Sequence, residues 1–205
     1  MRWPRLTRST AANRAASDPT PTPGKAELQP ASVNVYGLPR AAHRAAVRSF
    51  ASGQVPVEAV RSLVDAARWT GSARNRQPWR FVAVYDQGTR ADLSRLGAYA
   101  GHLATAPVAL VLLSPTTHQL DTEFDIGRVA QSLTLIAADR GLGCCIVSLY
   151  PDENAESAAR LVGGDDGWSA RHAIAIGVPR PTSRTGFSAI PLGRHDPDVL
   201  FRTIL

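Results

Sequence analysis

The sequence predicts one domain with an α/β or α+β sandwich fold, in which helices cover a central β-sheet. Apolar segments of strand length alternate along the chain with segments whose apolar residues recur at helical spacing. Of the 205 residues, 44% are hydrophobic and 20% charged, as in globular proteins that bury a core of their own. No apolar run approaches the ~20 residues that cross a bilayer, so we expect no membrane partner.

The first part of the chain has a different composition. Residues 1–33 are rich in Pro, Ser, Thr and Ala and lack apolar periodicity, which predicts a disordered basic arm before a domain at 34–205. Residues 1–40 hold six basic and two acidic residues, so they supply +4 of the formal net charge of +6. Because most of the charge lies outside the expected fold, we expect no nucleic-acid partner. A protein that binds partners through this arm is one alternative.

The first predicted elements are helices. Order is expected to begin near Leu38, and a first helix is expected over 41–50, after Pro39 and before the helix-breaking Ser52 and Gly53. Pro56 opens a second helix, whose apolar residues fall at three- and four-residue steps until Gly71.

Strands and helices then alternate. We expect strands at 80–85, 107–113, 144–149 and 173–178, and helices at 89–100, 122–140, 152–162 and 197–204. The helix at 122–140 is the longest, and Gly141 is its expected C-cap.

Cys144 and Cys145 are the only cysteines. Neighbouring residues on a strand point to opposite faces, and the pair matches no metal-binding spacing, so we interpret both as packing residues. Free thiols suit a reducing compartment, and no secretory signal precedes the domain, so we expect a cytoplasmic protein. The five histidines are scattered, and we interpret each as a surface or structural residue.

Three segments carry the candidate chemistry. Arg44 and Arg48 lie four residues apart, so a helix would present both guanidinium groups on one face, where they suit either a phosphate or solvent. The loop 71–79 offers Asn75 and Gln77, whose amides can contact the edge of a heteroaromatic ring, although a plain polar loop would look the same. Gly127 inside the helix at 122–140 predicts a close approach by another helix or a ring.

In this order, these segments resemble the nitroreductase family. That family has a basic R-x-S-x-R/K-x-F stretch, a P-S-x-x-N-x-Q-P-W-x-F loop and strand, a D-x-G-x-A-x-Q-x-L helix, a G-L-G-[ST]-C turn and an I-G-x-P strand. The counterparts here are Arg44 to Phe50, Ser72 to Phe81, Asp125 to Leu133, Gly141 to Cys144, and Ile176 to Pro179. The likeness covers residues 40 to 200.

The resemblance implies an α+β fold, an α/β sandwich with a central mixed sheet flanked by helices, and an intertwined homodimer that binds FMN at its interface. NADH or NADPH would reduce the FMN, and a quinone or nitroaromatic acceptor would then enter the same pocket. The residues that the resemblance places at the FMN are Arg44, Ala46, Arg48, Ser72, Asn75, Gln77, Ser148, Leu149 and Arg194. Arg44, Arg48 and Arg194 would bind the phosphate, with Arg184 as a rival for Arg194, and the amides of Ser148 and Leu149 would lie near the reactive ring nitrogen.

The chain departs from the family pattern at two positions. Ala46 stands where the family usually has Ser or Thr, and Gly71 replaces a proline. Two alternatives to a reductase remain: a dehydrogenase that oxidises a natural-product intermediate, and a non-catalytic flavin or deazaflavin binder in which Ala46 marks the loss of function. In an enzyme of this family the flavin would carry the chemistry, and we expect no catalytic side chain and no metal.

Overall fold

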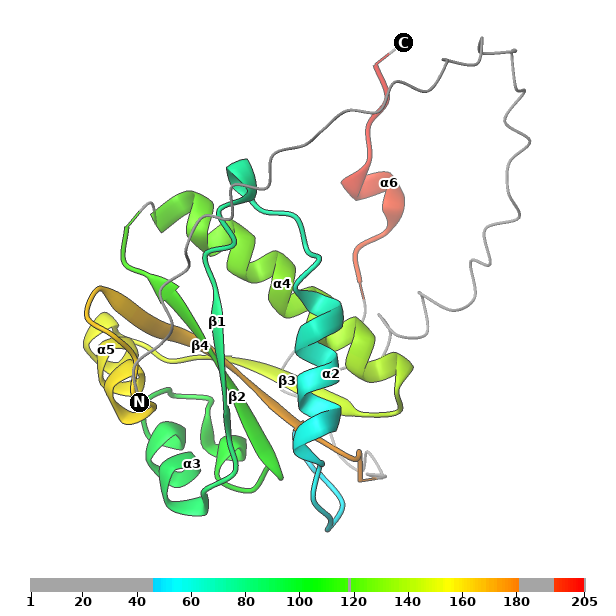
Figure 1. Ribbon diagram of the computed structural model, residues 1–205. Coiled ribbons are helices and arrows are strands. Elements are labelled where there is room, and N and C mark those ends of the chain that lie inside the picture. The colour runs from blue at the N-terminus through cyan, green and yellow to red at the C-terminus, as the bar shows by residue number, and fades with distance from the viewer. Residues whose placement is uncertain (1–45, 118, 181–193, 205) are drawn as a thin grey trace, which may run out of the picture.

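A computed structural model describes residues 46–117, 119–180 and 194–204. The arm expected at 1–33, residues 41–45 of the first expected helix, and Arg184 lie outside these ranges, and so does Arg44. The described residues form one four-stranded sheet with the strand order β1-β2-β4-β3 (Figure 1). Its strands are β1 (Arg80–Val84), β2 (Val108–Pro115), β3 (Gly143–Ser148) and β4 (Trp168–Gly177).

The pairing of these strands corrects one expectation. Neighbouring strands pair antiparallel throughout the described sheet, so it is not mixed. The helix between β2 and β3 does make these two strands parallel to each other. However, β4 lies between them and is antiparallel to both.

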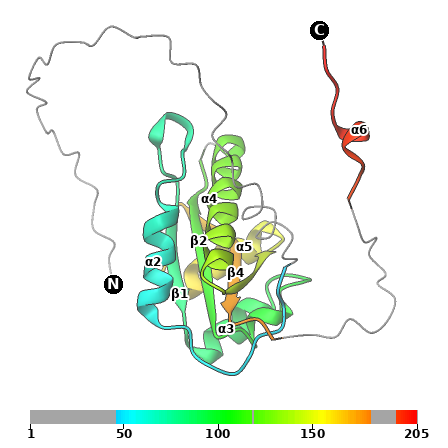
Figure 2. The ribbon, with the colours of Figure 1, turned by 90° about the vertical axis from the view of Figure 1, so that its right-hand side faces the viewer.

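Helices cover both faces, which confirms the α+β sandwich. Helices α2 (Val57–Ala67) and α4 (Gln119–Asp139) lie together on one face, as Figures 1 and 2 show. Helices α3 (Gln87–Ser94) and α5 (Asp152–Leu161) cover the other face. In both views the short α6 (Pro197–Leu200) stands apart from the sandwich. No helix in the described ranges has the length and apolarity needed to span a bilayer.

The central strands are buried on both faces, which explains their continuous apolar sequences. The side chains facing α2 and α4 are large: Leu110, Leu112, Ile174 and Ile176. Those on the opposite face include Ala109, Ala173 and Ala175, which belong to the same core as Ala158 and Ala159 of α5. Small residues on both sides let α5 lie close to the sheet.

The helix expected at 41–50 is wrong for residues 46–50, which run extended along the sheet. The Val47 N–H donates to the Cys144 carbonyl (2.9 Å), and Phe50 forms a bridge to Pro179. Gly143 and Gly177 form a cross-strand pair, and their missing side chains leave room for Val47 and Phe50. These tertiary contacts outweigh the helix propensity of the segment.

The other expected elements are present with shifted ends. The helix expected at 89–100 ends at Ser94, and the strand expected at 173–178 begins five residues earlier, at Trp168. The early part of β4 pairs with the end of β2 beyond a register shift between Leu112 and Ser114, and such irregularity weakens the alternating pattern that marks a strand. Gly141 caps α4 as expected, with a φ of 76°.

We predict that Gly177→Ala destabilises the fold. An added Cβ would lie 2.6 Å from Phe50 and 2.7 Å from Pro107, so neighbours must move, at a cost of about 1–3 kcal/mol in the free energy of unfolding. Gly101→Ala is the matched control, because nothing lies within 4 Å of its added Cβ. Urea denaturation of both variants measures the difference, and equal stabilities would show that the Phe50 segment does not lie against Gly177.

Candidate functional site

The loop before β1 has an unusual backbone. The short helix η1 (Ala73–Asn75) lies within it, and Arg74, Asn75 and Gln77 have φ values of 52°, 53° and 48°. Left-handed residues other than glycine cost of order 1–3 kcal/mol each, and they persist only where other contacts hold them. Pro78 and Trp79 are buried directly after the loop, and Trp79 packs in the core with α2 and α4.

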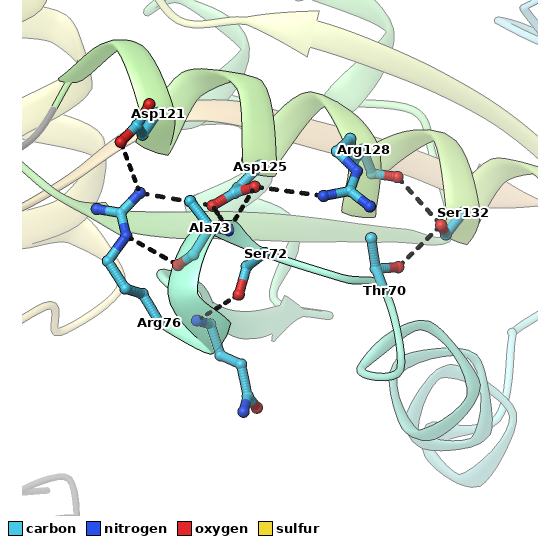
Figure 3. Close-up of polar contacts among 9 residues, drawn as sticks. Thr70, Ser72, Ala73, Arg76, Asp121, Asp125, Arg128 and Ser132 are labelled. Carbon is cyan, nitrogen blue, oxygen red and sulfur yellow. Dashed lines mark hydrogen bonds and ion pairs between the residues drawn. The ribbon is translucent and has the colours of Figure 1, made fainter.

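A buried carboxylate holds this loop in place. Asp125 of α4 is 1% exposed, and its oxygens accept hydrogen bonds from the Ala73 N–H at 3.0 and 3.3 Å (Figure 3). Arg76 and Arg128 place guanidinium nitrogens 3.5 and 3.6 Å from the same carboxylate. The ion pairs and the backbone bond together compensate the desolvation of this charge.

Contacts within the loop complete the anchor. The Ser72 hydroxyl accepts a hydrogen bond from the Gln77 N–H (2.8 Å), and the Gln77 amide donates to the Asn75 side chain (3.1 Å). Asn75 and Gln77 are exposed, so their amides face outward from a loop whose backbone is fixed. The loop thus offers a preorganised set of polar groups to a ligand or a second chain.

A second polar region lies along β3, at one edge of the described sheet. Cys144, Ile146 and Ser148 point to the α4 side of this strand, and we call this surface the β3 face. Ile146 is 39% exposed and Ser148 is exposed, so α4 leaves the outer part of this face open.

The backbone amides at the end of β3 differ in their partners. The Leu149 N–H donates to the Arg171 carbonyl (2.7 Å), and Leu149 is fully buried. Antiparallel ladders alternate, so the Ser148 N–H points away from β4, to the same outer edge where the Cys144 carbonyl meets Val47. Of the two expected amides, only that of Ser148 faces outward.

Arg48 lies exposed beside the start of β3. Burial lowers the pKa of His102, and the nearby charge of Arg48 lowers it further.

The two cysteines lie at the start of β3. Burial raises the pKa of Cys145, and the charge of Arg48 acts in the opposite direction. Burial, followed by the neighbouring Cys145, raises the pKa of Cys144 to about 12. Both cysteines are therefore protonated at neutral pH. Cys145 packs in the core on the α3 and α5 side of the sheet, and Cys144 packs against the core on the α2 and α4 side, so both act as packing residues.

An open groove of about 760 Å³ runs along α4 beside the loop. Gly71, Phe124, Gly127 and Arg128 are among the residues that line it, and Phe124 is 70% exposed. Within the chain nothing lies within 4 Å of the position that a Gly127 Cβ would occupy, so the close approach expected there does not come from this chain's described residues.

The structure divides the predicted site residues into two groups. Ser72, Asn75 and Gln77 share the loop that enters β1, whereas Arg48 and Ser148 flank β3. Because β1 and β3 are opposite edges of the four-stranded sheet, three strand spacings of about 5 Å each separate the groups. Ala46 and Arg194 are exposed, Arg44 lies outside the described residues, and Arg194 follows the undescribed segment 181–193.

Comparison with known proteins gives the class of the chain. The nitroreductase family model matches residues 41–96 and 94–178, so the chain belongs to the nitroreductase family, as its motifs predict. A protein of Methanothermobacter thermautotrophicus with the provisional name NADH dehydrogenase/NAD(P)H nitroreductase is 26% identical over 122 residues. The match covers 58% of this chain and 64% of that protein, slightly less than two thirds of its length.

Solved structures share the fold. The FMN-dependent nitroreductase of Clostridium difficile aligns with a TM-score of 0.62 at 20% identity, covering 75% of this chain and 96% of that one. A nitroreductase-like protein of Desulfovibrio desulfuricans, solved in complex with FMN, aligns with a TM-score of 0.62 at 23% identity, covering 78% and 98%. At these identities the likeness establishes the fold alone.

Asp125 is part of a family motif, but the sequence alone predicted no role for it. The signal that could have identified its role is its carboxylate, which opens the helical D-x-G stretch. Only the folded chain shows that it reaches the loop 52 residues earlier.

We predict that Asp125→Asn loosens the loop. The neutral amide keeps one acceptor but loses the attraction to Arg76 and Arg128, so we expect about 1–3 kcal/mol lower stability. Amide hydrogen exchange should become faster at Ala73. Asp121→Asn is the control, because Asp121 is 71% exposed and lies 3.9 Å from Arg76. Unchanged exchange at Ala73 in Asp125→Asn would contradict this anchoring role.

Proposed function

We propose that this chain is an FMN-dependent oxidoreductase that uses NADH or NADPH to reduce a small organic acceptor, such as a quinone or a nitroaromatic compound. Membership of the nitroreductase family supports the enzyme class and the cofactor. The observation that carries the proposal is that the chain has two preorganised polar surfaces. One is the loop with the outward amides of Asn75 and Gln77, and the other is the β3 face near Arg48.

The chemistry of the β3 face fits FMN. Arg48, beside the start of β3, offers a cation to the phosphate, the exposed Ile146 offers an apolar surface to the ring, and the Ser148 N–H offers a donor at the outer edge near the end of the strand. Cys144 and Ser148 are four residues apart, which corresponds to about 13 Å along a strand. Arg44 and Arg194 remain candidates for further phosphate contacts.

The separation of the two groups supports a homodimer. One flavin cannot contact both edges of the same sheet, but a second copy could place its loop over the β3 face of the first. The open groove and Phe124 leave apolar surface for such an interface. The terminal segment also exposes apolar side chains, with Phe201 74% and Ile204 92% exposed.

In this arrangement the chain positions its ligands. FMN, when bound, would supply the hydride chemistry between the nicotinamide and the acceptor. Arg48 would hold the phosphate end, the Ser148 N–H would donate to the ring, and Asn75 and Gln77 of a second copy would contact the ring edge. Cys144 and Cys145 remain protonated and take no part.

We predict that the purified protein is yellow and that Arg48→Ala weakens FMN binding about ten- to a hundred-fold. Charge-assisted bonds to a phosphate contribute roughly 1.5–3 kcal/mol. Arg61→Ala, at another exposed arginine, and Cys145→Ala, in the core, should bind FMN as wild type does. Fluorescence titration gives the dissociation constants. A colourless protein that also fails to bind added FMN would overturn the proposed function.

Mixing two variants that bind FMN weakly tests whether each FMN site contains residues of two chains. Arg48→Ala and Asn75→Ala should each weaken both sites of a homodimer. In a mixed dimer one site carries both lesions and the other carries neither, so one tight FMN per dimer should return. If mixing, confirmed by differential tags, restores no tight site, each FMN is bound within one chain.

A further inference from the structure

Three polar side chains form a hydrogen-bonded row beside the β3 face. His172 of β4 lies across from Ser148 of β3, with 3.3 Å between its Nδ1 and the Ser148 hydroxyl. Its Nε2 lies 3.0 Å from a carboxylate oxygen of Glu123 on α4. The side chains of His172 and Glu123 are 23% and 39% exposed, whereas Ser148 is exposed on the open outer part of the β3 face.

The other oxygen of Glu123 is also occupied. Arg171 lies 3.4 Å from it and is paired at 2.6 Å with Asp152 of α5. The register shift between Leu112 and Ser114 falls beside these residues, and such bulges redirect side chains near functional sites. The groups that face His172 are thus Glu123 from α4, Ser148 from β3 and, through Glu123, Arg171 and Asp152.

This arrangement fixes which nitrogen of the ring carries a proton. An ionised carboxylate only accepts hydrogen bonds, so Nε2 carries a proton and donates it to Glu123. In the neutral ring Nδ1 accepts from the Ser148 hydroxyl, and in the protonated ring Nδ1–H donates to it. The row can therefore deliver a proton through the serine hydroxyl to the open β3 face.

We propose that Ser148 and His172 form a proton relay to the electron acceptor, an inference that rests on the proposed function. A quinone that gains a hydride equivalent must also gain one proton to become a hydroquinone. The Ser148 O–H bond breaks as its proton passes to the acceptor oxygen, and the serine oxygen takes the Nδ1 proton of protonated His172. The neutral ring keeps its bond to Glu123 and regains a proton from water, so each turnover consumes one solvent proton.

The relay predicts a dependence on the acceptor. In His172→Gln, reduction of the bound FMN by NADH should keep its rate within about twofold, since it delivers no proton to an acceptor. Reoxidation by p-benzoquinone should slow by roughly a hundredfold, the usual contribution of a positioned acid. Reoxidation by ferricyanide, which takes electrons without a proton, should not change. His195→Gln, at an exposed histidine, is the matched control.

The outcomes separate the two proposals. Equal slowing with p-benzoquinone and ferricyanide would make His172 a structural residue, and unchanged rates with both would also overturn the relay. Failure of wild type and variant alike to bind FMN would instead overturn the proposed function.

A second measurement needs no flavin. The ¹⁵N spectrum of the His172 ring in the flavin-free protein should show the Nε2–H form of the neutral imidazole, and Glu123→Gln should weaken this preference. A neutral ring protonated at Nδ1 would contradict the relay, because Ser148 would then lack its acceptor.

Discussion

The contact of Asp125 with the Ala73 N–H is the constraint on which the candidate site depends. Three residues of the loop adopt left-handed backbone conformations, which are unfavourable for residues other than glycine. The loop keeps this shape because a buried carboxylate binds its backbone and two guanidinium groups balance the carboxylate. The outward direction of Asn75 and Gln77 is therefore set by a helix that carries neither residue.

A comparable dependence organises the other surface. The glycine pair at 143 and 177 admits Val47 and Phe50 to the sheet, and this contact brings Arg48 beside β3. The position of Arg48, a candidate to bind the phosphate, thus depends on the missing side chains of Gly143 and Gly177. Replacing either glycine would displace Arg48 as well as strain the core, so stability and FMN affinity should fall together at these positions.

The sequence allowed prediction of the sandwich and most elements, because long apolar runs and helical spacing reflect burial directly. It did not allow prediction of the extended segment at 46–50, where Ala and Arg favour a helix and tertiary contacts with Gly143 and Gly177 decide the backbone. The left-handed Arg74 and Gln77 were equally hidden, since their conformations depend on Asp125 far along the chain. The family motifs predicted which residues form the site, but not that these residues lie at opposite edges of the sheet.

That division links cofactor binding to assembly. If each FMN contacts the β3 face of one chain and the loop of another, FMN binds the dimer more tightly than the monomer, and by mass action it stabilises the dimer by the same free energy. FMN affinity should then fall at protein concentrations where the dimer dissociates. The loop 71–79 and the segment 46–50, which packs on Gly143 and Gly177, are both held in place before any ligand binds. Less conformational entropy is therefore lost on binding, so more of the free energy of the contacts would hold the two chains and the cofactor together.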